Sequence, residues 1–231
     1  MESLTNGRIA ALLEDLHRQA DAADGPFKAQ IMADLAASGK SVEEYFADLA
    51  AREKAGGQSA PRGFAERFLA VTPGYGRFLY MCVRASGARR IVEFGTSMGI
   101  STIYLAAGLR DNGGGHLIGS EFEPSKVVRA KAHLDAVGLA DLVEIREGDA
   151  LETLRDVAGP IDLLLLDGAF SLYLPVLQRL ETRLRTGALV LAENALDRDY
   201  LDYVRNPTNG FLSQSVALDE GRGNEVAVVT R

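Results

Sequence analysis

One short segment restricts the possible folds more than any other: five of the six residues in Ile161–Leu166 are isoleucine or leucine. A nearly continuous apolar run of this length predicts a strand that is covered on both faces. Other short apolar runs precede and follow it, and segments with helical periodicity separate them. Strands that alternate with helices favour right-handed crossovers and a parallel sheet between two helical layers. We therefore expect a doubly wound α/β fold.

The glycines and prolines between the apolar runs set the expected boundaries. The expected parallel strands are 89–94, 116–121, 142–146, 161–166 and 188–192, and the expected helices are 100–109, 124–137, 150–156 and 173–184. The chain ends differently, because only 219–224 separate the strand-like segments 211–218 and 225–230. So short a connection predicts a hairpin, and the sheet should therefore end in antiparallel strands.

The first 60 residues have a different character. Apolar residues recur at helical spacing in three segments, 9–16, 27–35 and 42–49. Asp-Gly-Pro at 24–26 predicts a break after the first segment, and 41–44 has the pattern of a capping box before the third. Residues 56–61 are rich in small residues and predict a linker. We expect 1–60 to be a helical extension that acts as a lid over a substrate pocket, as a dimerisation element or as both. Residues 61–231 then form the main domain.

Composition excludes several classes of partner. The chain of 231 residues has a formal net charge of −7, so it lacks the basic surface that attracts phosphate. We therefore expect neither nucleic acid nor an anionic membrane as a partner. The single cysteine, Cys82, excludes an intrachain disulfide and a cysteine zinc site. The N-terminal residues lack a signal-peptide pattern, and no apolar run approaches the roughly 20 residues that cross a bilayer. The sequence thus predicts a cytoplasmic protein.

A glycine-containing turn follows the first expected parallel strand. Ligands bind at the carboxyl ends of the strands in a doubly wound sheet. Gly95 and Gly99 permit a tight turn and a close approach of a ligand to the backbone. Ser97 stands where a dinucleotide-binding turn has its second glycine, which argues against a pyrophosphate site. Glu121 ends the next strand, where its carboxylate can accept both hydroxyls of a ribose. Together these features favour a nucleoside with a small zwitterionic tail.

The segment Val92–Thr102, with the sequence VEFGTSMGIST, resembles the first motif of class I S-adenosylmethionine-dependent methyltransferases. From about Phe64 to Arg231 the chain is similar to the catechol and caffeoyl-coenzyme A O-methyltransferase family, particularly its bacterial members that act on small molecules. The resemblance implies a Rossmann-like, mostly parallel sheet of seven strands whose last strand is antiparallel. It also implies S-adenosylmethionine as the cofactor and a homodimer as the assembly.

The resemblance further implies which residues bind the cofactor. The expected set is Thr72, Glu93, Gly95, Ser101, Glu121, Asp149, Ala150 and Asp167. Glu93, Gly95 and Ser101 would hold the methionine end of the cofactor, and Glu121 would hold its ribose. Asp149 and Ala150 would lie at the adenine edge, and Thr72 takes the family's N-terminal contact position. The position of Asp149 after the third strand independently suits an acceptor for the adenine amino group.

Oxygen-bearing side chains follow the fourth and fifth strands. Asp167 comes directly after the fourth, and Glu193 and Asn194 come after the fifth. Adjacent parallel strands that end at the same level would bring these three side chains together. Two carboxylates and a carboxamide suit Mg²⁺ or Ca²⁺, so we expect a divalent cation here. In the family that the chain resembles, a metal at this position binds the substrate hydroxyls, although Glu193 stands where the family has an aspartate.

One residue departs further from the family's pattern. Three residues after the first metal-binding aspartate, the family has a lysine that helps to deprotonate the substrate hydroxyl, whereas this chain has Phe170. We expect Asp167, Tyr173 and His17 to include the catalytic residues, with Glu193 and Asp197 as further candidates for the base. Phe170 is equally compatible with an aromatic substrate pocket and with core packing.

Two functional hypotheses follow from the sequence. The first is an S-adenosylmethionine-dependent O-methyltransferase that acts on a small aromatic or hydroxylated metabolite. The second is an S-adenosylmethionine-binding protein of the same fold that transfers no methyl group, either as a regulatory subunit or in another cofactor-assisted reaction. A dehydrogenase that binds NAD is disfavoured because Ser97 interrupts the glycine pattern.

Overall fold

The computed structural model describes residues 3–5, 7–55, 64–218 and 223–231. Its strands are β1 (Arg90–Phe94), β2 (His116–Glu121), β3 (Val143–Glu147), β4 (Ile161–Leu166), β5 (Leu184–Ala192), β6 (Phe211–Val216) and β7 (Asn224–Val229). Its α-helices are α1 (Gly7–Ser38), α2 (Val42–Ala55), α3 (Pro73–Ser86), α4 (Ile100–Asp111), α5 (Pro124–Val137), α6 (Ala150–Thr153), α7 (Tyr173–Leu180) and α8 (Arg198–Arg205). Its short 3₁₀ turns are η1 (Ser3–Thr5), η2 (Ala140–Leu142), η3 (Phe170–Leu172), η4 (Glu181–Arg183) and η5 (Pro207–Asn209).

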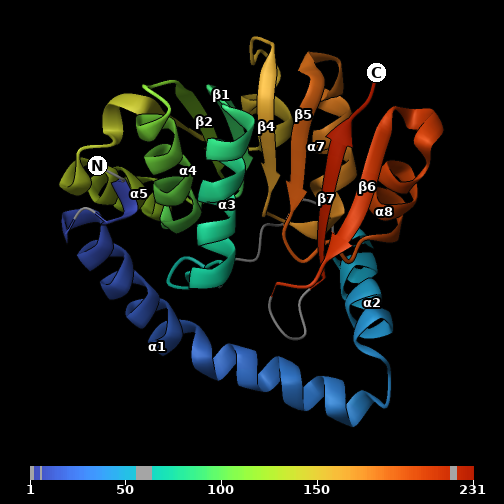
Figure 1. The fold of residues 1–231 in the computed structure, drawn as a ribbon. Helices are drawn as coiled ribbons and strands as arrows, with labels where there is room; N and C mark the ends of the chain where they lie inside the picture. Colours follow the sequence, from blue (N-terminus) through green and yellow to red (C-terminus); the bar gives the residue numbers. More distant parts are fainter. Residues whose placement is uncertain (1–2, 6, 56–63, 219–222) are drawn as a thin grey trace.

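The strands form one seven-stranded sheet in the order β3-β2-β1-β4-β5-β7-β6 (Figure 1). β1 to β5 pair in parallel, and β7 is antiparallel to both β5 and β6. The predicted seven-stranded doubly wound sheet with an antiparallel end is therefore confirmed. β5 begins at Leu184, earlier than the predicted start at residue 188, because its pairing with β4 continues through an irregularity in register.

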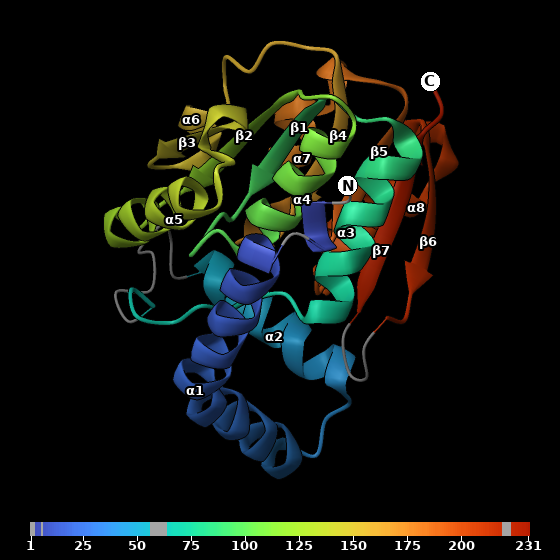
Figure 2. The ribbon, with the colours of Figure 1, turned by 60° about the vertical axis from the view of Figure 1, so that its left-hand side comes forward.

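Helices cover both faces of the sheet, as the apolar pattern of β4 predicts. Leu163 and Leu165 pack into a core with α3, α4, α5 and the first half of α1. Leu164 and Leu166 face the opposite core, which α6, α7 and α8 complete. Figure 2 shows α3, α4 and α5 together in front of the sheet. Within the described residues, no helix is both long and apolar enough to span a membrane.

The N-terminal extension is helical, but the predicted break at 24–26 is wrong. α1 continues through Pro26, which removes only one backbone donor. The helix is fixed there by tertiary contacts of Asp24, which the local pattern does not reveal. The capping box is confirmed, because Glu44 Oε2 accepts from Ser41 N at 2.9 Å and Ser41 Oγ accepts from Glu44 N at 3.2 Å.

Two predicted connections lie wholly or partly outside the described residues. The linker at 56–61, with the domain boundary inside it, lies outside the described residues, as do 219–222 of the hairpin connection. Figure 1 shows α1 running along the lower edge of the molecule, where the arrowheads of β4 and β5 lie. The extension therefore crosses the edge of the sheet at which ligands bind in such folds.

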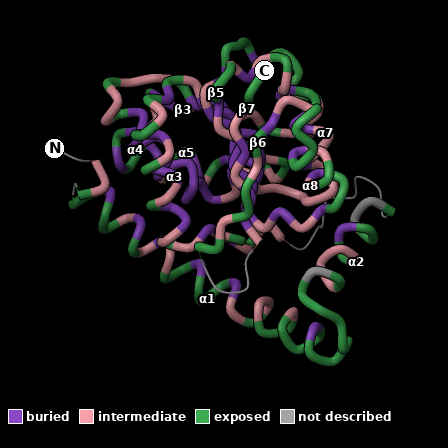
Figure 3. Tube along the Cα trace, turned by 45° about the vertical axis from the view of Figure 1, so that its right-hand side comes forward, coloured by how far each residue is buried: buried purple, intermediate pink, exposed green. Residues whose placement is uncertain are grey.

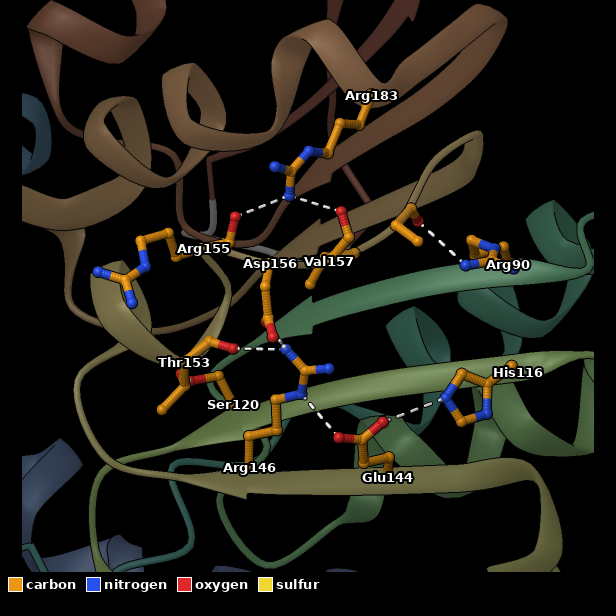
Figure 4. A network of polar contacts seen from close by, with 11 residues as sticks. Arg90, His116, Ser120, Glu144, Arg146, Thr153, Arg155, Asp156, Val157 and Arg183 are labelled. Carbon is orange, nitrogen blue, oxygen red and sulfur yellow. Dashed lines mark hydrogen bonds and ion pairs between the residues drawn. The ribbon is translucent and has the colours of Figure 1, made fainter.

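Arginines from three elements hold the connection that enters β4 from α6 (Figure 4). Arg146 donates to the carbonyl of Thr153, and Arg183 donates to the carbonyls of Arg155 and Val157. Arg90 donates to the carbonyl of Ala158 at 3.0 Å. These bonds satisfy carbonyls that have no partner in a helix or strand. The arginines stabilise the amino end of β4, away from the predicted ligand edge.

The contact between α3 and α4 yields a stability prediction. A Cβ atom on Gly76 would lie 2.2 Å from the ring of Tyr104, which is buried. Gly76→Ala should therefore lower the free energy of unfolding by about 1–3 kcal/mol, measured by chemical denaturation. Met81→Ala on the same helix is the control, because Met81 is 63% exposed and its change should stay within about 0.5 kcal/mol. Equal stability of the two variants would contradict this packing.

Candidate functional site

The turn after β1 is built on a buried carboxylate. Glu93 is fully buried and accepts hydrogen bonds from Thr96 Oγ1 at 3.0 Å, Ser101 Oγ at 2.7 Å and Thr102 Oγ1 at 2.6 Å. Burial raises the pKa of Glu93, and the three hydroxyls partly offset this effect. Glu93 and Ser101 thus bind each other beneath the turn. Their predicted contact with a cofactor stays a prediction.

Gly95 brings the end of β4 against this turn. Its φ is 97°, and a Cβ atom there would lie 2.2 Å from the carbonyl oxygen of Asp167. Asp167 N donates to the carbonyl of Phe94 at 2.8 Å, which continues the pairing of β4 with β1. Gly95, Ser101 and Asp167 line one pocket together with the segment 68–71. Only glycine permits so close an approach of the two strand ends.

Ser97 and Glu121 connect the turn to β2. Ser97 has a φ of 47°, and its N–H donates to Glu121 Oε2 at 2.7 Å. Glu121 Oε1 accepts from Glu123 N at 2.8 Å. The Ser97 N–H is therefore bonded to the Glu121 carboxylate and is not free to bind a phosphate, which supports the argument against a pyrophosphate site. Each oxygen of Glu121 keeps a second lone pair that can accept a ribose hydroxyl.

The remaining predicted cofactor positions lie beside these residues. Gly148 N donates to the carbonyl of Glu121 at 2.9 Å, so the end of β3 adjoins the end of β2. Asp149 follows and caps α6 by accepting from Leu151 N at 2.9 Å, and Ala150 is buried. Thr72 caps α3, where its Oγ1 accepts from Tyr75 N at 3.0 Å. The structure thus gathers the predicted set at one edge of the sheet.

The donor groups of the predicted cation site follow β4 and β5. Leu166 pairs with Ala192, so the following residues, Asp167 and Glu193, lie on neighbouring strand ends. The side-chain nitrogen of Asn194 donates to Glu193 Oε2, so its N–H group rather than its oxygen faces that carboxylate. Among the described residues, no three His, Cys, Asp or Glu side chains are placed to hold a metal. The divalent cation at Asp167, Glu193 and Asn194 stays a prediction.

Tyr173 does not have the properties of a general base. Its hydroxyl donates to the carbonyl of Glu193 at 2.7 Å, and its side chain is buried in the core beneath α7. Burial, followed by the carboxylates of Asp167 and Glu193, raises the pKa of Tyr173 well above its usual value. The hydroxyl therefore stays protonated and hydrogen-bonded to the Glu193 carbonyl, so Tyr173 does not fit the expected role of a catalytic base.

His17 lies away from the strand ends. Its Nε2 is 3.1 Å from the hydroxyl of Tyr104, and burial lowers its pKa. Arg77 lowers this pKa further, whereas Asp21 opposes the shift. A second cavity of about 560 Å³ is lined by His17, Tyr104 and Arg77 among others, and it shares no lining residue with the pocket at Gly95. The structure therefore does not bring His17 to the predicted site.

Sequence reasoning missed Tyr75, although its place one turn after Thr72 was a usable signal. Tyr75 is 1% exposed, and its hydroxyl has no hydrogen-bond partner among the described residues. Burial, and then the charges of Glu193 and Asp167, raise the pKa of Tyr75 well above its usual value. The hydroxyl of Tyr75 is therefore protonated, and it lies within electrostatic range of the carboxylates of Glu193 and Asp167.

The two tyrosines yield opposite stability predictions. Tyr75→Phe removes an unsatisfied buried hydroxyl and should raise the free energy of unfolding by about 1 kcal/mol. Tyr173→Phe removes the bond to the Glu193 carbonyl and should lower it by about 1–3 kcal/mol. Chemical denaturation of both variants measures the difference. A loss of stability in Tyr75→Phe as large as that in Tyr173→Phe would contradict this account of Tyr75.

The proteins that this chain resembles are methyltransferases. Residues 92–195 match a family model described as a methyltransferase domain. A catechol O-methyltransferase from Niastella koreensis is 32% identical over 164 residues, which cover 68% of this chain and 73% of that protein. A catechol O-methyltransferase from Mycobacterium tuberculosis is 35% identical over 129 residues, which cover 55% of this chain and 58% of that protein.

A solved structure extends the likeness to the whole fold. The O-methyltransferase TomG from Streptomyces achromogenes, involved in tomaymycin synthesis and solved in complex with S-adenosylmethionine, is 26% identical to this chain. The two superpose with a TM-score of 0.63, covering 83% of this chain and 91% of TomG. The chain is therefore an S-adenosylmethionine-dependent O-methyltransferase, and it belongs to the catechol and caffeoyl-coenzyme A O-methyltransferase family of class I methyltransferases.

Proposed function

We propose that this enzyme transfers the methyl group of S-adenosylmethionine to a hydroxyl group of a small aromatic metabolite. The observation that carries the substrate class is the half-buried Phe170, which begins η3 three residues after Asp167. Its ring packs edge-on against Tyr173 at 5.9 Å, and Tyr173 packs in the same way against Tyr200 at 5.8 Å. Tyr173 and Tyr200 are buried in the core, so of these three residues only Phe170 keeps a partly exposed ring. This ring, which we name the acceptor wall, suits an aromatic substrate that carries a hydroxyl group.

The residues at the strand ends fit the cofactor. Glu121 is held by two backbone N–H groups in an orientation that lets it accept both hydroxyls of a ribose. The carboxylate of Asp167, in the same pocket as Gly95, attracts the positively charged end of the cofactor. When bound, the cofactor supplies a sulfonium-activated methyl group, which needs no further activation by the protein.

The protein's contribution to the reaction is then mainly orientation. A nucleophilic oxygen held in line with the methyl group gains a large rate advantage from placement alone. Phe170 would hold the ring of the acceptor, and the Tyr75 hydroxyl can donate a hydrogen bond close to Asp167 and Glu193. We assign no deprotonating residue, because Tyr173 is protonated and His17 lines another cavity. Family membership favours methyl transfer over the alternative of a cofactor-binding protein without this activity.

We also propose that residues 1–60 act as a lid. α2 packs against η3, the turn that begins with Phe170, and α1 runs along the carboxyl edge of the sheet. The extension thus lies over the proposed acceptor wall.

A homodimer is the assembly that we propose. Figure 3 shows that much of the distal half of α1 and of α2 is exposed. Apolar side chains are among the exposed residues: Met32 is 61% exposed, Val42 40% and Leu49 37%. Burial of such side chains favours self-association. Sedimentation equilibrium should show a dimer, and a monomer at micromolar concentration would contradict this proposal.

The substrate class can be tested with an acceptor panel. The enzyme should form S-adenosylhomocysteine from S-adenosylmethionine with phenols and catechols, but not with aliphatic alcohols, as measured by chromatography. Phe170→Ala should raise the KM for the aromatic acceptors about tenfold and leave the KM for S-adenosylmethionine unchanged, because it removes only the acceptor wall. Leu212→Ala is the control, since Leu212 is 68% exposed on β6. Turnover with aliphatic acceptors alone would overturn the aromatic assignment.

A further inference from the structure

The middle of α1 contains an aspartate in an unusual environment. Asp24 is fully buried, although Ala22 and Ala23 before it are exposed. Its Oδ1 accepts from Phe68 N at 3.0 Å, and its Oδ2 accepts from Leu69 N at 2.7 Å. Burying a carboxylate is costly unless hydrogen bonds compensate for lost water. Both oxygens are compensated here by the backbone of one distant segment, so Asp24 fixes that segment to α1.

The fixed segment is a wall of the pocket at the β1 turn. Residues 68–71 line that pocket together with Gly95 and Asp167. The carbonyl of Phe68 accepts from Ser97 Oγ at 2.6 Å, so the wall is tied to the turn on its other side. Leu69 has a φ of 48°, a left-handed conformation that is unfavourable for a leucine. The wall therefore needs external bonds to keep its shape, and Asp24 provides two of them.

Charged residues of α5 lie beside the same contact. Lys126 is buried, and the negative charges of Glu121 and Asp24 oppose the lowering of its pKa by burial. The guanidinium of Arg129 lies 5.2 Å from the centre of the Phe68 ring. Lys126 thus stands within electrostatic range both of the carboxylate proposed to bind the ribose and of Asp24. The wall, α1 and the ribose position form one connected polar region.

We propose that Asp24 is a positioning residue for the cofactor: by holding residues 68–71 against the β1 turn, it makes α1 a part of the cofactor site. Asp24 is not among the residues that line the pocket. It acts through the backbone of Phe68 and Leu69. The inference rests on the proposed location of the cofactor at the Gly95 turn.

The test is the affinity for S-adenosylhomocysteine, measured by calorimetry, which needs no methyl acceptor. Asp24→Asn keeps the size of the side chain but replaces one accepting oxygen with an amide group that cannot accept from an N–H. This variant should bind S-adenosylhomocysteine at least tenfold more weakly than the unchanged enzyme. Asp34→Asn is the matched control, because Asp34 is exposed on the same helix, and its affinity should be unchanged.

A second substitution separates positioning from general stability. Leu69→Gly removes the unfavourable left-handed leucine, so the wall needs less external support. Adding Leu69→Gly to Asp24→Asn should recover part of the lost affinity, relative to the effect of Leu69→Gly alone. A recovery of affinity for S-adenosylhomocysteine in the double variant would support the proposal. If Asp24→Asn only destabilised the fold, adding Leu69→Gly would not raise this affinity.

The calorimetric result distinguishes a failure of the proposed cofactor site from a failure of the proposed role of Asp24. Failure of the unchanged enzyme to bind S-adenosylhomocysteine would refute the cofactor site itself. Binding by the unchanged enzyme together with unaltered affinity in Asp24→Asn would refute only the positioning role, as would a lower melting temperature without a change in affinity. Should Asp24→Asn not fold, the proposal is tested instead by hydrogen exchange on the unchanged enzyme, measured with and without S-adenosylhomocysteine. The amides of Phe68 and Leu69 should gain protection on binding, and an absence of this gain would overturn the inference.

Discussion

The buried carboxylate of Glu93 is the interaction on which the geometry of the site depends. A carboxylate in the apolar interior is costly, and here three hydroxyls, from the turn after β1 and the first turn of α4, compensate for it. These bonds tie β1 to α4 and fix the path of the turn between them. Because the path is fixed, Gly95 lies against the carbonyl of Asp167, and the Ser97 N–H reaches Glu121. Three strand ends are thus brought to one point.

The second constraint comes from outside the sheet. The wall at 68–71 is held between Ser97 on the turn and Asp24 on α1. The N-terminal helix is therefore part of the structure that shapes the pocket, and not only an appendage that packs on the domain. α2 then reaches η3, so the extension contacts both the proposed cofactor side and the proposed acceptor side of the site.

The chemistry around β4 and β5 differs from that of the family's pattern in a consistent way. Phe170 occupies the position of a lysine, and its ring packs on Tyr173, which is itself bonded to the backbone of Glu193. The side-chain amide of Asn194 donates to the carboxylate of Glu193. Tyr173, Glu193 and Asn194 are thus joined to one another by hydrogen bonds at the ends of β4 and β5. In the proposed function, the half-buried ring of Phe170 would contribute to catalysis by placing the acceptor.

The sequence by itself determined the elements of the sheet, and it predicted a cofactor site at the carboxyl ends of the strands. The apolar run of β4, the capping box at Ser41 and the glycines of the β1 turn are signals that can be recognised from neighbouring residues, although β4 itself pairs with the distant strand β1. The family motif then identified the residues at the strand ends. Periodicity and turn chemistry suffice for these features because they depend on neighbouring residues.

Only the tertiary structure decided how distant residues meet. Pro26 predicted a helix break that does not occur, since Asp24 is bonded to residues more than forty positions away. His17 was expected at the site but faces Tyr104, and Tyr75 was not expected there but lies near Asp167 and Glu193. Contacts between elements far apart in the chain leave no periodic signal. Their partners are chosen by packing and by the need to satisfy buried polar groups, which only the folded chain reveals.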